Sequence, residues 1–341
     1  MNSKTEQKLT YSIALLLSSP YRKTFESLGR NIGVSGDTIS RLVEHKAATI
    51  QDLVKIVKTV WKRRRLYLII DDTLIMKIYS KIIQGTSDNY DSSDGKVYRS
   101  LCAVVALITD GEIAIPIDLG IWTSEEVNKN GYQKKWQIAR EIIERLQTEI
   151  PIYMLLADGL YAIYEFMVWL IAKNIKFEMR FHANRVITDK EYLGQIKWHP
   201  KFKLTSRRPM LTIRITWKNT SFYVTAFRRV NKAGDVTVVY LISNYKASAR
   251  GHVRAYELRW IIEKFFRTGK QYLGLGDCQS RKLNLQKNHL MNVFLIYAIL
   301  QIQCRKFNMK NVESLIRRLN SYDFHELLSQ FARLAENFAI A

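Results

Sequence analysis

The stretch that most constrains the fold is YELRWIIEKFFRTGK, which begins at Tyr256 and ends at Lys270. Its spacing predicts one helix, and at about 100° per residue Tyr256, Arg259, Glu263 and Lys270 share an arc of about 60°. The apolar residues fall elsewhere and can anchor the helix to a core. One stripe therefore presents a phenol, two cations and a carboxylate. Chance alignment is the alternative, and Gly269 could end the helix before Lys270.

Acidic residues follow two apolar runs, each of which predicts a buried strand. Residues 66–70 (LYLII) lead into Asp71 and Asp72, and residues 152–157 (IYMLLA) lead into Asp158. Charges at strand ends in a mixed α/β sheet lie at the rim, where ligands bind. A carboxylate there costs desolvation energy unless it is paired, and a divalent cation is one efficient partner. Capping of the following turn is the alternative, above all where Asp158 precedes a glycine.

Around these acids the sequence alternates between strand and helix patterns, in the order β-β-β-α-β-α-β. Residues from about 186 to 244 carry strand patterns separated by turn signals, which predicts an inserted β module. From residue 247 onward the pattern is helical. The expected core strands are 66–70, 97–108, 112–121, 152–157 and 177–181, the helices are 134–146 and 161–172, and the inserted strands are 211–217, 221–227 and 236–243.

Near the N-terminus, residues 25–43 have the pattern of a helix-turn-helix. Gly33 can make the tight turn, because positive φ costs little without a Cβ, and Ser35 can cap the next helix. The second helix of such a unit commonly enters the DNA major groove. A helical hairpin that touches no DNA is the alternative. The candidate DNA-contacting residues on the exposed face are Thr38, Ser40 and Arg41.

The charge of the chain indicates a polyanionic partner. The 341 residues include 53 Lys and Arg against 31 Asp and Glu, which gives a net charge of +22. A protein this basic repels itself unless an anion neutralises it, and nucleic acid is the commonest such partner. The four cations of residues 62–65 can be a solvated linker or can hold phosphates. A hydrophobic content of 47% excludes wholesale disorder.

The cysteine and hydropathy patterns indicate in which cellular compartment the protein is expected. The three cysteines are scattered, which argues against a disulfide framework and a structural zinc site, and the six histidines show no metal-ligand spacing. The apolar run at 11–17 is too brief for a signal peptide, and the run at 291–304 is too short and too polar to span a bilayer. We therefore expect a cytoplasmic, nucleoid-associated protein with no membrane partner.

Three motifs together resemble a known enzyme family. The helix stripe fits Y-x2-R-x3-E-x6-K, residues 70–73 resemble an I-D-x-T motif, and residues 158–161 resemble a D-G-x-Y motif. Taken in chain order, with the two aspartate motifs before the helix stripe, they resemble the DDE transposases of the insertion-sequence-four group of bacterial mobile elements. The resemblance covers roughly residues 66–300. The resemblance implies a ribonuclease-H-like fold, here an α/β fold with a mixed five-stranded sheet and an inserted all-β module.

The resemblance also implies the chemistry. Asp71, Asp158 and Glu263 would be the catalytic and metal-binding residues, with Asp72 as the alternative first acid. Two Mg²⁺ ions, for which Mn²⁺ can substitute, would support in-line phosphoryl transfer: water frees a 3′-OH at the element end, and that hydroxyl attacks target DNA.

Further residues are expected to contact the DNA backbone or a flipped base. Those near the helix stripe are Tyr256, Arg259, Lys270, Arg254, Arg267, Arg281 and Lys282. Arg180 and Arg185 lie at the end of the last core strand. Trp198 and Trp217 are the aromatic candidates of the insertion, with buried packing as their alternative.

These features predict that the chain divides into segments with different roles. The expected domains are an N-terminal helical DNA-binding domain at 1–62, the first part of the catalytic core at 63–185, the β module at 186–245, and the second part of the core with C-terminal helices at 246–341. The expected partners are double-stranded DNA, as terminal inverted repeats and target, and a second copy of the chain. The alternatives are a nuclease without strand transfer and a decayed or domesticated DNA-binding protein.

Overall fold

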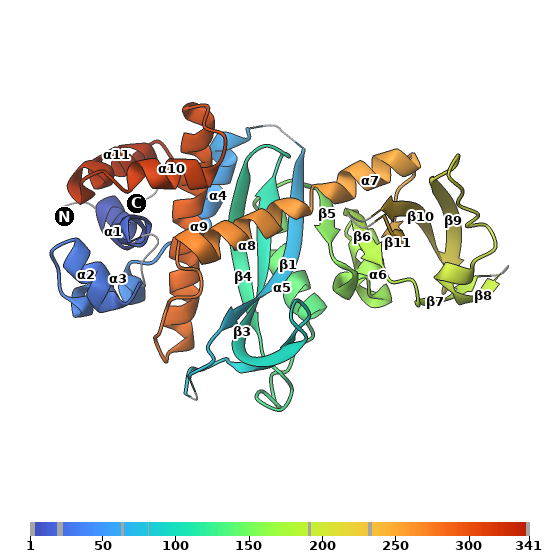
Figure 1. The fold of residues 1–341 in the computed structure, drawn as a ribbon, viewed down its shortest axis with the longest axis horizontal. Helices are drawn as coiled ribbons and strands as arrows, with labels where there is room; N and C mark the ends of the chain where they lie inside the picture. The colour runs from blue at the N-terminus through green and yellow to red at the C-terminus, as the bar shows by residue number, and fades with distance from the viewer. Residues whose placement is uncertain are drawn as a thin grey trace. The chain divides into compact units, whose positions relative to one another are not determined.

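A computed structural model describes residues 4–18, 23–62, 65–80, 82–189, 192–230 and 234–338. The chain forms two compact units (Figure 1). The first unit takes residues 1–64, 72–150 and 261–341, and the second takes 65–71 and 151–260. Strand β1 (Leu66–Met76) contributes its first part to the second unit and the rest to the first. Arg63 and Arg64 of the predicted cationic run lie outside the described residues.

The sheet of the first unit is built on one long apolar strand. In hydrogen-bonding order the strands are β2-β3-β1, and β4 pairs antiparallel with β3. Residues 101–108 of β3 are all buried, because their sequence LCAVVALI leaves no polar side chain to face water. The bounds are β2 (Ser87–Asp91), β3 (Lys96–Thr109) and β4 (Ala114–Trp122), with α5 (Lys135–Gln147) packing on β4 and β3.

Helix α9 (Leu283–Lys306) forms the helical core of the first unit. It is buried along most of its length and contacts β4 as well as α1, α3, α4 and α10. The apolar run at 291–304 is therefore a core helix, as predicted. No helix in the described parts of the chain is both long and apolar enough to cross a membrane. The other helices are α1 (Lys4–Leu17), α2 (Phe25–Asn31), α3 (Gly36–His45), α4 (Ile50–Val60), α8 (Trp260–Tyr272), α10 (Val312–Leu319) and α11 (Phe324–Glu336).

The turn between α2 and α3 has the local geometry predicted from its sequence. Gly33 adopts φ +75°, and the Ser35 side chain accepts a hydrogen bond from the Thr38 backbone N–H, which caps α3. A Cβ at Gly29 would meet the Val34 carbonyl oxygen at 2.5 Å, so the turn lies this close to α2 only with glycine there. The DNA-binding role of this segment remains a prediction.

The second unit is a sheet that contacts helices α6 and α7. Its strand order is β1-β5-β6-β11-β10-β9; β5 runs parallel to β1 and β6, and β11 runs antiparallel to β6. The predicted five-stranded sheet is therefore too small, because three strands of the expected insertion continue the same sheet beyond β6. The bounds are β5 (Ile152–Ala157), η1 (Gly159–Tyr161), α6 (Tyr164–Ala172), β6 (Lys176–Phe181), β7 (Val186–Asp189), β8 (Tyr192–Gln195), η2 (Ile196–Trp198), β9 (Met210–Trp217), β10 (Thr220–Val230), β11 (Val236–Ser243) and α7 (Ala249–Glu257).

Several elements differ from their predicted bounds. Strand β1 continues to Met76, so Asp71 and Asp72 lie inside the strand and not after its end. A 3-10 turn occupies residues 159–161, and α6 starts at Tyr164, three residues later than expected. Strand β2 was not predicted. The three cysteines are free and buried, as expected for a chain without a disulfide framework.

Candidate active site

Two of the predicted acids follow matched positions of neighbouring strands in the second unit. The parallel register pairs Ile70 of β1 with Ala157 of β5, and the next residues along the two strands are Asp71 and Asp158. Both carboxylates are half-buried. The strands bring together residues that are far apart in the sequence, as the paired apolar runs predicted.

The Asp158 carboxylate also closes the turn that follows it. Its Oδ1 accepts a hydrogen bond of 2.6 Å from the Gly159 backbone N–H, so the turn-capping alternative describes part of what this side chain does. Gly159 lies close to His182, because a Cβ there would meet His182 Nε2 at 2.6 Å unless the imidazole shifted. Burial lowers the pKa of His182, and the neighbouring Asp158 carboxylate partly opposes that shift.

Arg259 is the partner of Asp71 within the same unit. Its Nη1 donates to Asp71 Oδ2 at 2.7 Å, and the two side chains are 9% and 15% exposed. The guanidinium lies 5.6 Å from the ring centre of Tyr256 and 5.5 Å from that of Trp260. A buried arginine that contacts two rings and pairs with one carboxylate fixes the orientation of that carboxylate.

The helix expected to carry the whole stripe is interrupted, so that prediction was wrong. Helix α7 ends at Glu257 and α8 begins at Trp260, which leaves Arg259 in the intervening turn. The turn is where Arg259 makes its contact with Asp71. Gly269 does not end α8, which continues to Tyr272 and keeps the exposed Lys270 in the helix.

Tyr256 is a buried hydroxyl in the same neighbourhood. Burial raises its pKa to about 12, with Arg259 lowering it and Asp158 raising it. The phenol therefore stays protonated at neutral pH and can serve as a neutral hydrogen-bond donor. Its position close to Asp158 and Arg259 places a phenol, a guanidinium and two carboxylates in one region of the second unit.

Asp72 makes a different set of contacts, in the first unit. Lys135 Nζ donates to its Oδ2 at 2.6 Å, and the Cys102 thiol donates to the same oxygen at 3.6 Å. Burial lowers the pKa of Lys135, but Asp72 and Cys102 outweigh that effect, so the net shift is upward. Adjacent residues of a strand point to opposite faces, which explains why the two acids have separate partners.

Glu263 occupies the first turn of α8, in the first unit, and is half-buried. Across the described ranges of the chain, no group of three or more His, Cys, Asp or Glu side chains is close enough to hold a metal ion. The donors themselves fit Mg²⁺, because Asp71, Asp158 and Glu263 offer carboxylate oxygens, the ligand type that this ion prefers.

The other predicted DNA-contacting residues are distributed over both units. Lys282 is exposed and pairs with Glu44 at 3.0 Å. Trp217 is 6% exposed and packs against Tyr164 and Phe181, so its alternative role in packing is the observed one, whereas Trp198 is 69% exposed. The exposed cations are Arg254, Arg267, Arg281, Arg180 and Arg41, while Thr38, Ser40 and Arg185 are half-buried.

A buried polar network in the second unit was not anticipated. Glu178 on β6 is fully buried, and its Oε2 contacts His252 Nδ1 of α7 at 2.6 Å and accepts from the Tyr245 hydroxyl at 2.8 Å. Burial raises the pKa of Glu178, and these two partners lower it. The network ties α7, which carries Tyr256, to the strand beside β5. The sequence signal was one acid between two apolar residues, Phe177 and Met179, of the strand KFEMRF.

Comparison with known protein families identifies the part of the chain that contains these acids. A family model described as the transposase DDE domain matches residues 62–299, which is well over half of the chain. No curated protein matches the sequence. The matched range includes β1, β5 and α8, and with them all three predicted acids.

Proposed function

This chain belongs to the transposase DDE-domain family, and on that premise we propose that it is the transposase of an insertion sequence of the insertion-sequence-four group. Family membership implies DNA as the substrate. We propose further that the enzyme binds the terminal inverted repeats of its element, hydrolyses a phosphodiester at each end, and joins the freed 3′-OH to target DNA. The N-terminal helices and a second copy of the chain would hold the two ends.

The observation that supports this assignment most directly is the register of β1 and β5. Asp71 and Asp158 follow paired residues of two parallel strands, inside the segment that matches the family. Two carboxylates placed on neighbouring strands are costly unless a cation or hydrogen-bond donors compensate for their charge. Asp72 is the weaker candidate for the first acid, because it lies one residue beyond the position that matches Asp158 and contacts Lys135 and Cys102 of the first unit.

Members of this family generally use divalent metal ions, and Asp71, Asp158 and Glu263 are the residues that would hold Mg²⁺ here. When bound, such ions stabilise the charge on the attacking and leaving oxygens of an in-line displacement at phosphorus. Arg259 would keep Asp71 in one orientation through their ion pair. Tyr256 would donate its phenolic proton to a backbone phosphate oxygen, and Lys270 would neutralise phosphate charge.

The two chemical steps use the same type of displacement. In the first, the oxygen of water forms a bond to phosphorus and the 3′ oxygen at the element end leaves. In the second, that 3′ oxygen forms a bond to a phosphorus of target DNA and displaces a 3′ oxygen of the target strand. One set of positioned groups can serve both, because the geometry at phosphorus is the same.

The decisive test is cleavage of a linear duplex that carries the element's terminal repeat, in Mg²⁺, by the wild type and by Glu263→Gln. We expect the variant to bind the duplex with unchanged affinity and to cut it roughly a thousandfold more slowly, the equivalent of losing several kcal/mol of charge stabilisation. Glu257→Gln is the matched control, because Glu257 is an exposed glutamate at the end of α7.

The products separate this proposal from its alternatives. Joining of the cut end to a second plasmid identifies a transposase, whereas cutting without joining identifies a nuclease. Binding without cutting by the wild type would identify a non-enzymatic DNA-binding protein. If Glu263→Gln cuts as well as the wild type and Glu257→Gln, then Glu263 is not part of the active site.

A further inference from the structure

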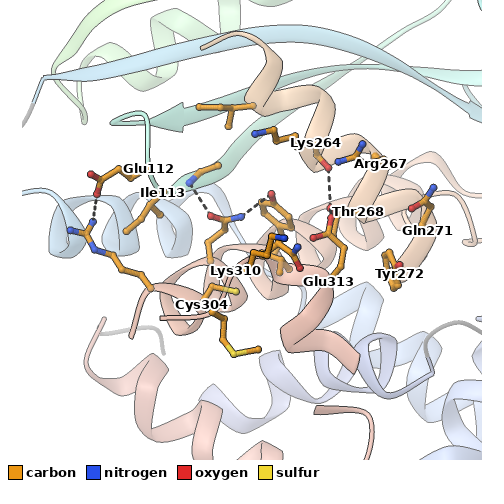
Figure 2. Close-up of a pocket in the computed structure, with 18 of the residues that line it drawn as sticks. Glu112, Ile113, Lys264, Arg267, Thr268, Gln271, Tyr272, Cys304, Lys310 and Glu313 are labelled. Atoms are coloured by element: carbon orange, nitrogen blue, oxygen red, sulfur yellow. Dashed lines mark hydrogen bonds and ion pairs between the residues drawn. The ribbon is translucent and has the colours of Figure 1, made fainter. Parts of the chain in front are cut away.

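The first unit contains a pocket that the proposed chemistry does not use. Its volume is 670 Å³, and Asp71, Asp158 and Glu263 do not line it. One wall is α8, and the others are the C-terminal part of α9, the segment that enters α10, and the turn between β3 and β4. Figure 2 shows Lys264, Arg267, Thr268 and Gln271 along α8, with Lys310 and Glu313 approaching from the start of α10.

Positive charge dominates the lining of this pocket. Five cationic side chains line it against two carboxylates, and both carboxylates have partners. Glu112 pairs with Arg305 at 3.2 Å, and Glu313 accepts a hydrogen bond of 2.5 Å from the Thr268 hydroxyl. The remaining cations are Lys264, Arg267, Lys310 and Arg317.

Three of these cations keep their charge available for a ligand. Lys264, Arg267 and Lys310 are exposed and form no ion pair with a carboxylate of the described residues. Arg317 is held in place, because it donates to the Tyr272 hydroxyl at 3.2 Å and lies 5.9 Å from the centre of that ring. The pocket thus combines fixed and adaptable cations.

Backbone charge adds to the side chains. The first residues of α10 line the pocket, and Asn311 caps that helix by accepting from the Ser314 backbone N–H at 2.9 Å. The amino end of a helix carries partial positive charge and favours anions. An anion in this pocket would therefore meet cationic side chains and a helix amino end together.

Around the axis of α8, the side chains that line the pocket lie next to Glu263. At about 100° per residue, Lys264, Arg267 and Gln271 are turned from Glu263 by about 100°, 40° and 80° in the same direction. They form the next stripe of the same helix. A polyanion that passes Glu263 could therefore continue along this stripe without leaving α8.

We propose that this pocket binds a backbone phosphate of duplex DNA outside the cleavage site, with Lys264, Arg267 and Lys310 as the contacting cations. The proposal rests on the proposed function, because it assumes that DNA is the polyanion. It adds a specific DNA-holding site formed by α8, α9 and α10. Contacts of this kind position the duplex and do not read its sequence.

The test compares two double variants that lose the same charge. Lys264→Gln with Lys310→Gln removes two cations from the pocket, and Lys173→Gln with Lys306→Gln removes two exposed lysines that do not line it. Fluorescence anisotropy with a labelled duplex, without divalent metal, gives the dissociation constant at several salt concentrations. Each phosphate contact contributes about 0.9 to the slope of log affinity against log salt.

We expect the slope of the pocket variant to fall by about 0.9 in magnitude, because one phosphate contact is lost, and that of the control variant to stay at the wild-type value. The charge-preserving pair Lys264→Arg with Lys310→Arg should keep the wild-type slope. Equal slopes for the pocket and control variants would overturn the proposal. So would an unchanged slope together with stabilisation by inorganic phosphate against heat that the pocket variant loses, because the ligand would then be a small phosphate compound.

This measurement does not depend on catalysis. If the wild type cuts no DNA but the salt slope of the pocket variant falls as expected, the proposed function fails and the pocket proposal stands. If cutting depends on Glu263 but the slopes of the pocket and control variants agree, the proposed function stands and the pocket proposal fails.

Discussion

His289 makes the stability of the first unit sensitive to acid. It is buried on α9, with Nδ1 2.6 Å from the Tyr11 hydroxyl and Nε2 2.7 Å from the Gly274 carbonyl oxygen. These partners suit a neutral ring that accepts from the tyrosine and donates to the carbonyl. Burial lowers the pKa of His289 to about 3; the Gly274 carbonyl opposes the shift, and Lys77 and Lys23 add to it.

The size of the effect follows from linkage. An unfolded histidine has a pKa of about 6.5, so below that pH the unfolded chain binds a proton at His289 that the folded chain does not bind. A lowered folded pKa gives stability that is fully present above pH 6.5 and is lost progressively as the pH falls toward 3. Between pH 7 and 4.5 this single group should remove about 2.5 kcal/mol of the free energy of unfolding.

Urea unfolding followed by tryptophan fluorescence at both pH values tests this for the wild type, His289→Gln and Tyr11→Phe. We expect His289→Gln to be less stable at pH 7, by about 1–3 kcal/mol, because the Tyr11 hydroxyl loses its partner. Its acid-induced loss should be smaller than that of the wild type by about 2.5 kcal/mol. Tyr11→Phe leaves the imidazole buried and should keep the wild-type loss. Parallel losses in the wild type and His289→Gln would refute the reasoning.

Contacts near the proposed site give further expected outcomes. Asp71→Asn should abolish DNA cleavage, whereas Asp72→Asn should keep the cleavage rate within about tenfold of the wild type and lower the free energy of unfolding by about 1–3 kcal/mol. Nicking assays and urea unfolding measure the two effects. An equal loss of cleavage in both variants would count against Asp71 as the first acid. Burial raises the pKa of Glu178, so the stability linked to its protonation is lost as pH rises. Glu178→Gln should therefore gain stability relative to the wild type as pH rises above about 4.3, and a difference that stays constant with pH contradicts this. Gly159→Ala should destabilise the protein by about 1 kcal/mol because its Cβ would meet His182, and a double-mutant cycle with His182→Ala should recover most of that loss; additive effects would exclude the close approach as its cause.

The pair of strands that carries Asp71 and Asp158 could be predicted because its causes are local. Each acid follows an uninterrupted apolar run, and such runs between turn signals are typical of buried strands. The continuation of β1 to Met76 could not be predicted in the same way. Aspartate is unfavourable in strands, and β1 is also paired with β3, which is a tertiary contact.

The interruption between α7 and α8 shows a second limit of predicting structure from sequence. Leu258, Arg259 and Trp260 are all compatible with a helix, so the local sequence contains no stop signal. The turn coincides with the contact between Arg259 and Asp71, which are 188 residues apart. The helical wheel therefore assumed one continuous helix where the structure has two helices and a turn.

The buried partners of charged side chains were the part least accessible from the sequence. Glu178 and His252 lie 74 residues apart, and neither has a neighbour in the sequence that indicates the other. Strand alternation can place an acid on a face, but it cannot tell whether that face is covered by a helix. Only the packing of α7 on β6 decides this.

The burial of all three cysteines has a practical consequence for following this protein on DNA. Burial raises the pKa of Cys102 to about 12 and that of Cys304 to about 11, and it raises the pKa of Cys278 as well. Only thiolates react readily with maleimides or oxidants, so these side chains should be almost inert at neutral pH. A cysteine introduced at an exposed position would then carry a fluorophore or spin label alone, with the native thiols left in place.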